Sequence, residues 1–255
     1  MSDVISLRGL SHSYNETPVL RGIDLTVARG EFVGLIGLSG AGKSTLLRCI
    51  NGLIVPTGGT CRVLDQQVED LSANDRRLLR RRIGMIFQEF NLVDRLTARK
   101  NVLIGRLAYV PRLASCLHRF PKADVELATR SLADVGLAGY EFRRVREMSG
   151  GQKQRVAIAR AMAQGADLIL ADEATANLDV LTKDEIMILL RELMVAREVT
   201  VLASMHDVEL AKRYCTRIIG LKGGRITFDA APSDLDEQAV AEVMGRSPAI
   251  ASPGM

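Results

Sequence analysis

The sequence predicts an α/β fold, in which apolar strands alternate with helical segments along most of the chain. An apolar run at 32–36 is followed by a glycine-rich loop and by a helical pattern at 43–52. Two further runs, 167–173 and 199–204, are short and mainly apolar, as expected of strands buried on both faces of a parallel sheet. The helical pattern at 182–196 lies between them. This order of elements is typical of a sheet covered by helices.

Composition sets few limits on function. The chain has 255 residues, of which 47% are hydrophobic and 25% charged, enough for one large domain or two small ones. Its first residues have no signal-peptide character and no apolar run approaches a membrane span, so we expect a cytoplasmic protein unless a partner holds it to a membrane. The net charge of +4 permits binding to nucleic acid or anionic lipid without requiring it. The four cysteines form no CxxC pair, which predicts free thiols and no metal cluster.

The glycine-rich loop, Gly37 to Ser44, matches the phosphate-binding pattern G-x-x-x-x-G-K-[ST] at every fixed position. Its glycines let successive backbone N–H groups turn around an anion, and the helix beginning near Gly42 directs its positive dipole end at the same anion. Lys43 would place a charge on the β- and γ-phosphates, and the Ser44 hydroxyl could bind magnesium. A dinucleotide fold is the alternative, but its G-x-G-x-x-G spacing is missing. The loop therefore predicts binding of a nucleoside triphosphate.

Two acids, Asp172 and Glu173, end the apolar run at 167–173. Carboxylates at the C-terminal edge of a parallel sheet lie where α/β proteins bind ligands. Asp172 is placed to hold magnesium, directly or through water, and Glu173 to polarise the attacking water. Together with the phosphate loop, these acids predict a nucleotide hydrolase or switch.

A second anion site is predicted at Ser149–Gln152, where a double glycine opens the helical run 153–163. A mainly helical insert separates it from the phosphate loop, so it is not expected to reach the same nucleotide within one chain. A head-to-tail pair of subunits solves this, because each ATP would then be closed by the Ser-Gly-Gly motif of the other chain.

The remaining elements follow from periodicity and from the positions of glycine and proline. Strands or hairpins are expected at 4–7, 22–27, 60–68, 84–88, 217–221 and 225–229. Further helices are expected at 123–135, 208–214 and 234–244. The first of these lies in a helical stretch from Lys100 to Gly139 that is interrupted near Pro111 and Pro121.

Three features have more than one interpretation. Tyr14 lies in a polar connection, where it could be half-buried surface or could stack on a base, and the sequence favours neither. Five arginines between Arg76 and Arg82 could form a nucleic-acid patch, but a basic solvated helix face is commoner and no aromatic residue is interleaved with them. His206 follows a strand, where a lone histidine is usually only a satisfied polar residue.

Taken together, these motifs resemble the ATP-binding cassette (ABC) family, and the resemblance extends from Val4 to about Gly245. It implies that Tyr14 stacks on adenine and that His206 contacts the γ-phosphate. Gln88 matches the glutamine that links magnesium to the membrane partner. The phosphate loop is matched by Gly37, Ser39, Gly40, Ala41, Gly42, Lys43, Ser44 and Thr45. The signature motif is matched by Ser149, Gly150, Gly151 and Gln152. The second acidic motif is matched by Asp172 and Glu173, and the dimer-contacting loop by Asp179.

The resemblance implies a single ABC ATPase domain over residues 1–245 and a flexible tail at 246–255. The expected fold is an α/β P-loop NTPase core with an N-terminal antiparallel β subdomain and a helical subdomain, at about 98–165, inserted before the signature motif. Catalysis would fall to Glu173, His206 and Gln88. Magnesium would be held by Ser44, Gln88 and Asp172, and the other matched residues would bind ATP.

The implied partners are a second copy of the chain, two membrane permease subunits and, indirectly, a periplasmic substrate-binding protein, but no nucleic acid. The protein would lie peripherally on the cytoplasmic face of the inner membrane. Three residues depart from the family pattern without removing a catalytic group. Met148 replaces Leu with little change in volume, Ala174 replaces a common Pro and would loosen the loop, and Asn177 replaces Ala or Ser near the dimer contact.

Within the family, the chain looks like the phosphonate importer ATPases, which implies transport of phosphonate or of reduced phosphorus oxyanions such as phosphite and hypophosphite. Lys100 departs from their pattern, and the chain is too short for the additional C-terminal domain of sugar-importer ATPases. Polar amino acid importer ATPases lack the extra segment 108–120. The similar segments are Phe87–Val93, Arg95–Thr97, Asn101–Leu107, Phe120–Lys122 and the extra segment.

Other functions remain as alternatives: the ATPase of an exporter or of lipoprotein release, a cassette protein of the carbon–phosphorus lyase complex, or an ABC-type protein of DNA repair or translation. Repair proteins separate the two phosphate motifs by coiled coils or zinc modules, and translation proteins carry two cassettes per chain. This chain shows neither feature. The neighbouring genes, encoding permeases and a binding protein or else lyase components, would separate the rest.

Overall fold

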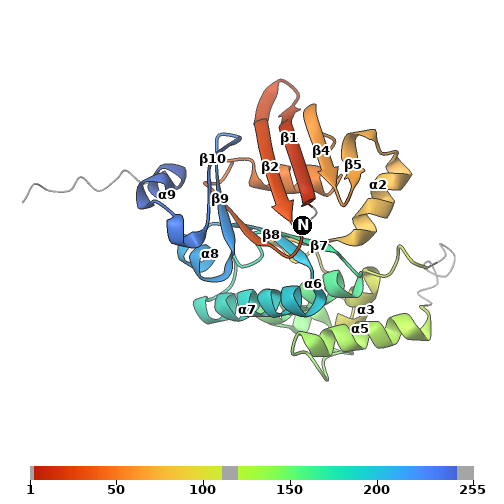
Figure 1. The fold of residues 1–255 in the computed structure, drawn as a ribbon. Coiled ribbons are helices and arrows are strands. Elements are labelled where there is room, and N and C mark those ends of the chain that lie inside the picture. The colour runs from red at the N-terminus through yellow and green to blue at the C-terminus, as the bar shows by residue number, and fades with distance from the viewer. Residues whose placement is uncertain (1–2, 111–119, 246–255) are drawn as a thin grey trace, which may run out of the picture.

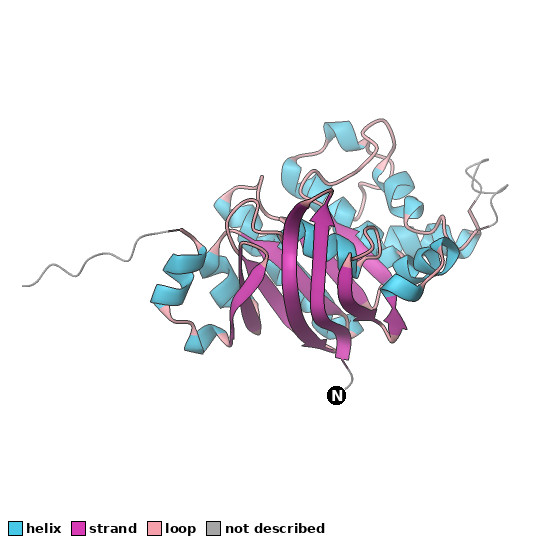
Figure 2. Ribbon diagram, turned by 90° about the horizontal axis from the view of Figure 1, so that it is seen from above, coloured by secondary structure: helices cyan, strands magenta, loops and turns pink. Residues whose placement is uncertain are grey.

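Two β-sheets organise the computed structural model, which describes residues 3–110 and 120–245 (Figure 1, Figure 2). The smaller sheet has the order β2-β1-β4-β5 and is antiparallel. Its strands are β1 (Asp3–Tyr14), β2 (Thr17–Ala28), β4 (Gly58–Val63) and β5 (Gln66–Gln67). The larger sheet, in the order β10-β9-β3-β8-β7-β6, contains β3 (Phe32–Ile36), β6 (Ile83–Ile86), β7 (Leu168–Asp172), β8 (Thr200–Met205), β9 (Arg217–Lys222) and β10 (Arg225–Ala230).

The larger sheet is parallel except at one edge, where β10 pairs antiparallel with β9. Every residue of β3, β6, β7 and β8 is buried, as expected for strands covered on both faces. Because parallel strands end at the same edge, the residues that follow Ile36, Ile86, Asp172 and Met205 gather along one side of the sheet. This side carries the candidate site.

Helices lie around the larger sheet, and α2 (Ala73–Leu79) lies beside the smaller one (Figure 1). The described residues form α1 (Lys43–Ile50), α2 (Ala73–Leu79), α3 (Ala98–Ile104), α5 (Lys122–Asp134), α6 (Gly150–Ala163), α7 (Val180–Arg197), α8 (Val208–Tyr214) and α9 (Glu237–Val243). Helices α3 and α5 pack against α6 and against each other. Of these helices, none has the length and apolarity needed to span a membrane.

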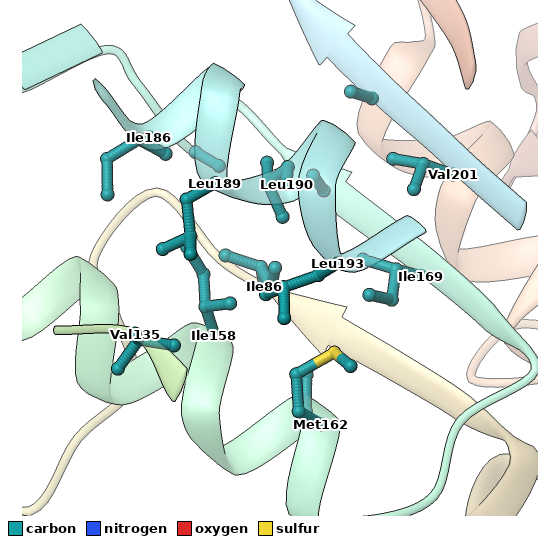
Figure 3. Close-up of a cluster of buried hydrophobic side chains, with 14 of the residues drawn as sticks. Ile86, Val135, Ile158, Met162, Ile169, Ile186, Leu189, Leu190, Leu193 and Val201 are labelled. Carbon is teal, nitrogen blue, oxygen red and sulfur yellow. The ribbon is translucent and has the colours of Figure 1, made fainter. Parts of the chain in front are cut away.

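The main hydrophobic core lies between α6, α7 and the larger sheet (Figure 3). Leu190 and Leu193 of α7 face Ile169 and Val201 of the sheet. Ile158 of α6 belongs to the same cluster. A second core joins the smaller sheet, α1 and the opposite face of the larger sheet. Burial of these apolar side chains fixes the strand ends in place, since it is the main favourable term in folding.

The predicted α/β fold with an N-terminal antiparallel sheet is confirmed, but several boundaries differ. The strand expected at 4–7 continues to Tyr14, which was expected in a polar connection. The expected helix at 234–244 is shorter: α9 starts only after Asp236, whose side chain accepts a hydrogen bond from the Gln238 amide. A 3₁₀ turn over Pro232–Asp234 precedes it. Most of the extra segment 108–120, and the predicted tail 246–255, lie outside the described residues.

The arginines at 76–82 make internal contacts. Arg80 donates to the Gly52 carbonyl, and Arg82 pairs with Asp167 at 2.6 Å. Both therefore join this segment to the rest of the fold. The thiols of the described residues are free and buried, at Cys49, Cys61 and Cys215.

Candidate active site

The phosphate-type loop connects β3 to α1 and lies at the C-terminal edge of the larger sheet. Glycine is required at two of its positions. A Cβ atom on Gly37 would stand 2.3 Å from the Leu221 carbonyl oxygen. Gly42 has a φ of 108°, and its Cβ would stand 3.0 Å from Leu20 Cδ2. The loop is thus held between β2 and β9 while α1 begins at Lys43.

Lys43 is folded back into this loop. Its Nζ donates to the carbonyl oxygens of Gly37 and Leu38, at 2.9 and 3.1 Å, and lies 3.6 Å from Glu173 Oε1. The residue is 4% exposed. Burial lowers the pKa of Lys43, while the nearby charges of Glu173 and Asp172 raise it in part. The lysine is thus a buried cation with partners that an incoming anion could replace.

Asp172 is the centre of a small hydroxyl network. Its Oδ1 accepts hydrogen bonds from Ser44 Oγ and Ser204 Oγ, each at 2.9 Å, and the Ser204 hydroxyl accepts from the Glu173 amide at 2.9 Å. Hydroxyl and carboxylate oxygens are ligands that Mg²⁺ prefers, so Ser44 and Asp172 fit this ion. No cluster of three or more His, Cys, Asp or Glu ligands occurs among the described residues, so these oxygens would hold the ion together with phosphate and water oxygens.

Ser204 was not identified from the sequence. It lies in β8 directly opposite Asp172 of β7, and it is 2% exposed. The available signal was a hydroxyl near the C-terminal end of a mainly apolar strand, at the sheet edge where the two acids also lie. Its partner could only be recognised once the two strands were known to be neighbours.

Glu173 and His206 meet beyond the ends of β7 and β8. The His206 Nε2 and Glu173 Oε1 atoms are 2.5 Å apart. Glu173 has a φ of 51°, a left-handed conformation that costs energy for a non-glycine residue and is often found at functional sites. The end of β7 and the hydrogen bond to His206 therefore place the Glu173 carboxylate next to Lys43.

Gln88 and Tyr14 come from the two different sheets. Gln88 is exposed in the turn after β6, at the same sheet edge as Asp172, but among the described residues no hydrogen bond joins the two. Tyr14 is 44% exposed at the end of β1, opposite Thr17 of β2. Since β2 contacts the loop at Gly42, the β1–β2 hairpin brings Tyr14 to the phosphate-loop side of the molecule.

The second glycine motif forms a separate group. Ser149 begins α6 with a capping box, in which its hydroxyl accepts from the Gln152 amide and the Gln152 side chain accepts from the Ser149 amide. Asp179 begins α7 and accepts from both the amide and the hydroxyl of Thr182, which lowers the pKa of Asp179. A Cβ on Gly151 would stand 2.6 Å from Thr182 Cγ2, so the two helix starts adjoin.

This second group makes no described hydrogen bond or ion pair with Lys43, Ser44, Asp172 or Glu173. The sequence expectation of two separate phosphate motifs thus corresponds to two separate clusters. A family model described as "ABC transporter" matches residues 20–176, more than half of the chain. The chain belongs to the ABC transporter family. As a member, it is a nucleotide-binding ATPase coupled to transport across a membrane.

Curated relatives of this ABC ATPase match nearly its whole length. The phosphonates import ATP-binding protein PhnC of Chromohalobacter salexigens is 47% identical over 243 residues, which cover 95% of this chain and 89% of that protein. PhnC of Bordetella parapertussis is 46% identical over 250 residues, covering 96% and 98%. Among solved structures, a dimeric ATP-binding cassette in a post-hydrolysis state, bound to ADP and Pi, matches with a TM-score of 0.78 at 33% identity, covering 89% of this chain and 98% of that one.

Proposed function

We propose that this ABC ATPase powers a bacterial importer for phosphonates or related reduced phosphorus oxyanions, such as phosphite and hypophosphite. The observation that carries the substrate class is a series of eight curated relatives, 42–47% identical over 89–96% of the chain, all of them phosphonate import proteins by name. The chain would not contact the transported molecule, because its own site is built for a nucleotide.

Binding of ATP would use the groups around the phosphate loop. Lys43 would exchange the carbonyl oxygens of its own loop for β- and γ-phosphate oxygens. The negative phosphates would then compensate its buried positive charge. Ser44 and Asp172, joined by Gln88, would hold Mg²⁺, which when bound neutralises phosphate charge. Tyr14 would stack on the base. The backbone from Ser39 to Thr45 would surround the phosphates.

Hydrolysis would depend on Glu173 as the general base, which takes a proton from the attacking water. In the structure this carboxylate is bonded to His206 and close to Lys43. When phosphate replaces it beside Lys43, Glu173 would be free to face the water while His206 contacts the γ-phosphate. These roles are consistent with the left-handed conformation of Glu173 directly after β7, because such strained residues are often found at functional sites.

Closure of the site would require a second copy of the chain. The cluster of Ser149, Gly150, Gly151, Gln152 and Asp179 has its backbone donors at a helix start, yet it makes no described bond to Lys43 or its neighbours. We infer a homodimer in which this cluster covers the nucleotide of the partner, an inference supported by the dimeric state of the related cassette. Two permease subunits would dock on the dimer at the cytoplasmic face of the inner membrane, and a periplasmic binding protein would deliver the substrate.

The test is growth and uptake in a strain that lacks the gene. The deletion should abolish growth on a phosphonate or phosphite as sole phosphorus source, while growth on phosphate survives. The wild-type gene should restore growth, and the Glu173→Gln gene should not. Uptake of labelled phosphonate must disappear as well. If uptake persists while phosphorus release stops, the chain serves the carbon–phosphorus lyase instead. Normal growth on all such compounds, with no paralogous cassette present, would overturn the substrate class.

A further inference from the structure

A buried histidine, His12, lies against the side chain of Tyr14. The centroids of the two rings are 4.8 Å apart, and their planes are inclined by 85°. In such an edge-to-face pair, the positive edge of one ring meets the negative face of the other, which holds both in place. Tyr14 itself is 44% exposed at the tip of a hairpin, next to the left-handed residue Asn15. Among the described residues, the aromatic contact of Tyr14 is with the ring of His12.

His12 is an unusual residue to bury at this position. It is 7% exposed, and neither Nδ1 nor Nε2 has a hydrogen-bond partner among the described residues. Buried polar atoms are normally paired, and an apolar side chain would fill the same space without this cost. What His12 supplies beyond volume is a flat ring whose edge or face can meet Tyr14.

The same part of the hairpin is tied to the phosphate loop. His12 lies opposite Leu20 in the pairing of β1 with β2. Leu20 in turn packs against Gly42, whose Cβ would stand 3.0 Å from Leu20 Cδ2. His12 is therefore paired across the hairpin with a residue that contacts the phosphate loop, and its ring contacts that of Tyr14. An orientation set here is set relative to the phosphate site.

We propose that His12 is a positioning residue that fixes the ring of Tyr14 for stacking on the base of the bound nucleotide. This inference rests on the proposed function of Tyr14. A side chain that is already ordered loses less conformational entropy when a ligand binds. By ordering the Tyr14 ring in the free protein, His12 would therefore increase the affinity for the nucleotide. The gain concerns the base alone, because His12 has no described contact with Lys43, Ser44 or Asp172.

The experiment compares ATP with inorganic tripolyphosphate, which has the phosphate chain but no base. Dissociation constants are measured by calorimetry, with magnesium present, for the wild type, His12→Leu and His12→Phe. His12→Leu keeps the buried volume without a ring and should weaken ATP binding about 2- to 10-fold. Its binding of tripolyphosphate should not change. His12→Phe restores a ring, so it should bind both ligands as the wild type does.

Tyr14→Ala is the reference variant, and the loss of stacking should weaken ATP binding roughly 10-fold or more. In a Tyr14→Ala background, His12→Leu should have no further effect on ATP binding. If His12→Leu binds ATP normally while Tyr14→Ala does not, His12 has no positioning role and the role of Tyr14 stands. If His12→Leu weakens both ligands equally, the effect is a general structural one and the inference is wrong. If Tyr14→Ala binds ATP normally, the stacking proposal itself fails.

Discussion

At the residue scale, the burial of Lys43 makes the stability of the fold depend on pH. Burial lowers the pKa of Lys43 below its ordinary value of 10.5, with Glu173 and Asp172 opposing the change. The pKa of Lys43 is lower in the folded chain than in the unfolded chain. At pH values below the folded pKa, the lysine is charged in both states, and the full cost of burying its charge lowers the free energy of unfolding. That cost disappears as the pH rises from the folded pKa toward the ordinary value, since the unfolded chain then binds more protons than the folded one.

We therefore expect Lys43→Met to alter both binding and the pH dependence of stability. The variant keeps the apolar stem and removes the charge, and ATP affinity should fall roughly 10-fold or more because a charge-assisted phosphate contact is lost. The free energy of unfolding of the wild type should rise relative to that of the variant as the pH approaches 10.5. Calorimetry and urea titrations across alkaline pH measure the two effects. Lys122→Met, at a side chain that is 92% exposed, should show neither.

Ser204 shows that a hydroxyl outside the sequence motifs can control both acids. It donates to Asp172 and accepts from the Glu173 amide. Ser204→Ala should raise the magnesium concentration needed for half-maximal ATPase activity by about 10-fold, the lower end for loss of a group that orients a metal ligand. Ser131→Ala is the matched control, since Ser131 is buried and its Oγ has no described partner. An equal response of the two variants to magnesium would contradict the assignment.

At the scale of elements, Arg106, in the turn after α3, joins that turn to α5 and α6. Its Nε bonds Asp124 of α5 at 2.9 Å, its guanidinium lies 3.9 Å from the ring centroid of Tyr109, and its Nη1 donates to the Ala163 carbonyl at the end of α6. The Arg106 and Asp124 side chains are 17% and 11% exposed. Removing one partner of such a shielded ion pair lowers the free energy of unfolding, because the remaining charge stays buried without its partner.

Asp124→Leu should therefore lower the free energy of unfolding by about 3 kcal/mol, the lower end for a buried pair, since both side chains keep some exposure. The double variant Arg106→Met, Asp124→Leu should recover most of this loss, because no unpaired charge remains. Urea denaturation measures both. Glu126→Gln, which breaks the exposed pair with Lys122, is the control and should leave stability unchanged. A double variant as unstable as the single one would show that the contact with Ala163 or Tyr109 matters more than the charge.

The helices, strands and loops were predictable where residues close together in the sequence determine the local structure. The strands at 168–172 and 200–205 are apolar runs, and Gly37 to Lys43 form a motif whose residue types fix the turn. The late start of α9 depends on Asp236 acting as the cap, which periodicity does not reveal. Contacts between strands or helix starts, such as Ser204 with Asp172 and Gly151 with Thr182, depend on topology. The sequence lacked that information because neither pair is close along the chain.

At the scale of the whole molecule, the chain carries two separate clusters that the proposed function assigns to one shared site. Lys43, Asp172 and Glu173 lie at the sheet edge, whereas Ser149 and Asp179 begin helices in a separate cluster. If each half serves a different subunit, hydrolysis must depend on association, and blocking the chemical step must trap the associated form. A monomeric enzyme with a complete site would behave otherwise.

Glu173→Gln tests this dependence, because it removes the proposed base and keeps the shape of the side chain. Turnover should fall by roughly 10²–10⁴, the range expected for loss of a general base. ATP should then shift the variant to twice its mass in light scattering, since bound nucleotide cannot be cleaved and the closed pair persists. Adding Lys43→Met should reduce the shift at ATP concentrations that just saturate Glu173→Gln, because it weakens ATP binding. Adding Asp179→Ala should weaken the pair while the monomer still binds ATP. A wild-type activity strictly proportional to protein concentration, with no dimer of Glu173→Gln in ATP, would show that each chain hydrolyses ATP alone.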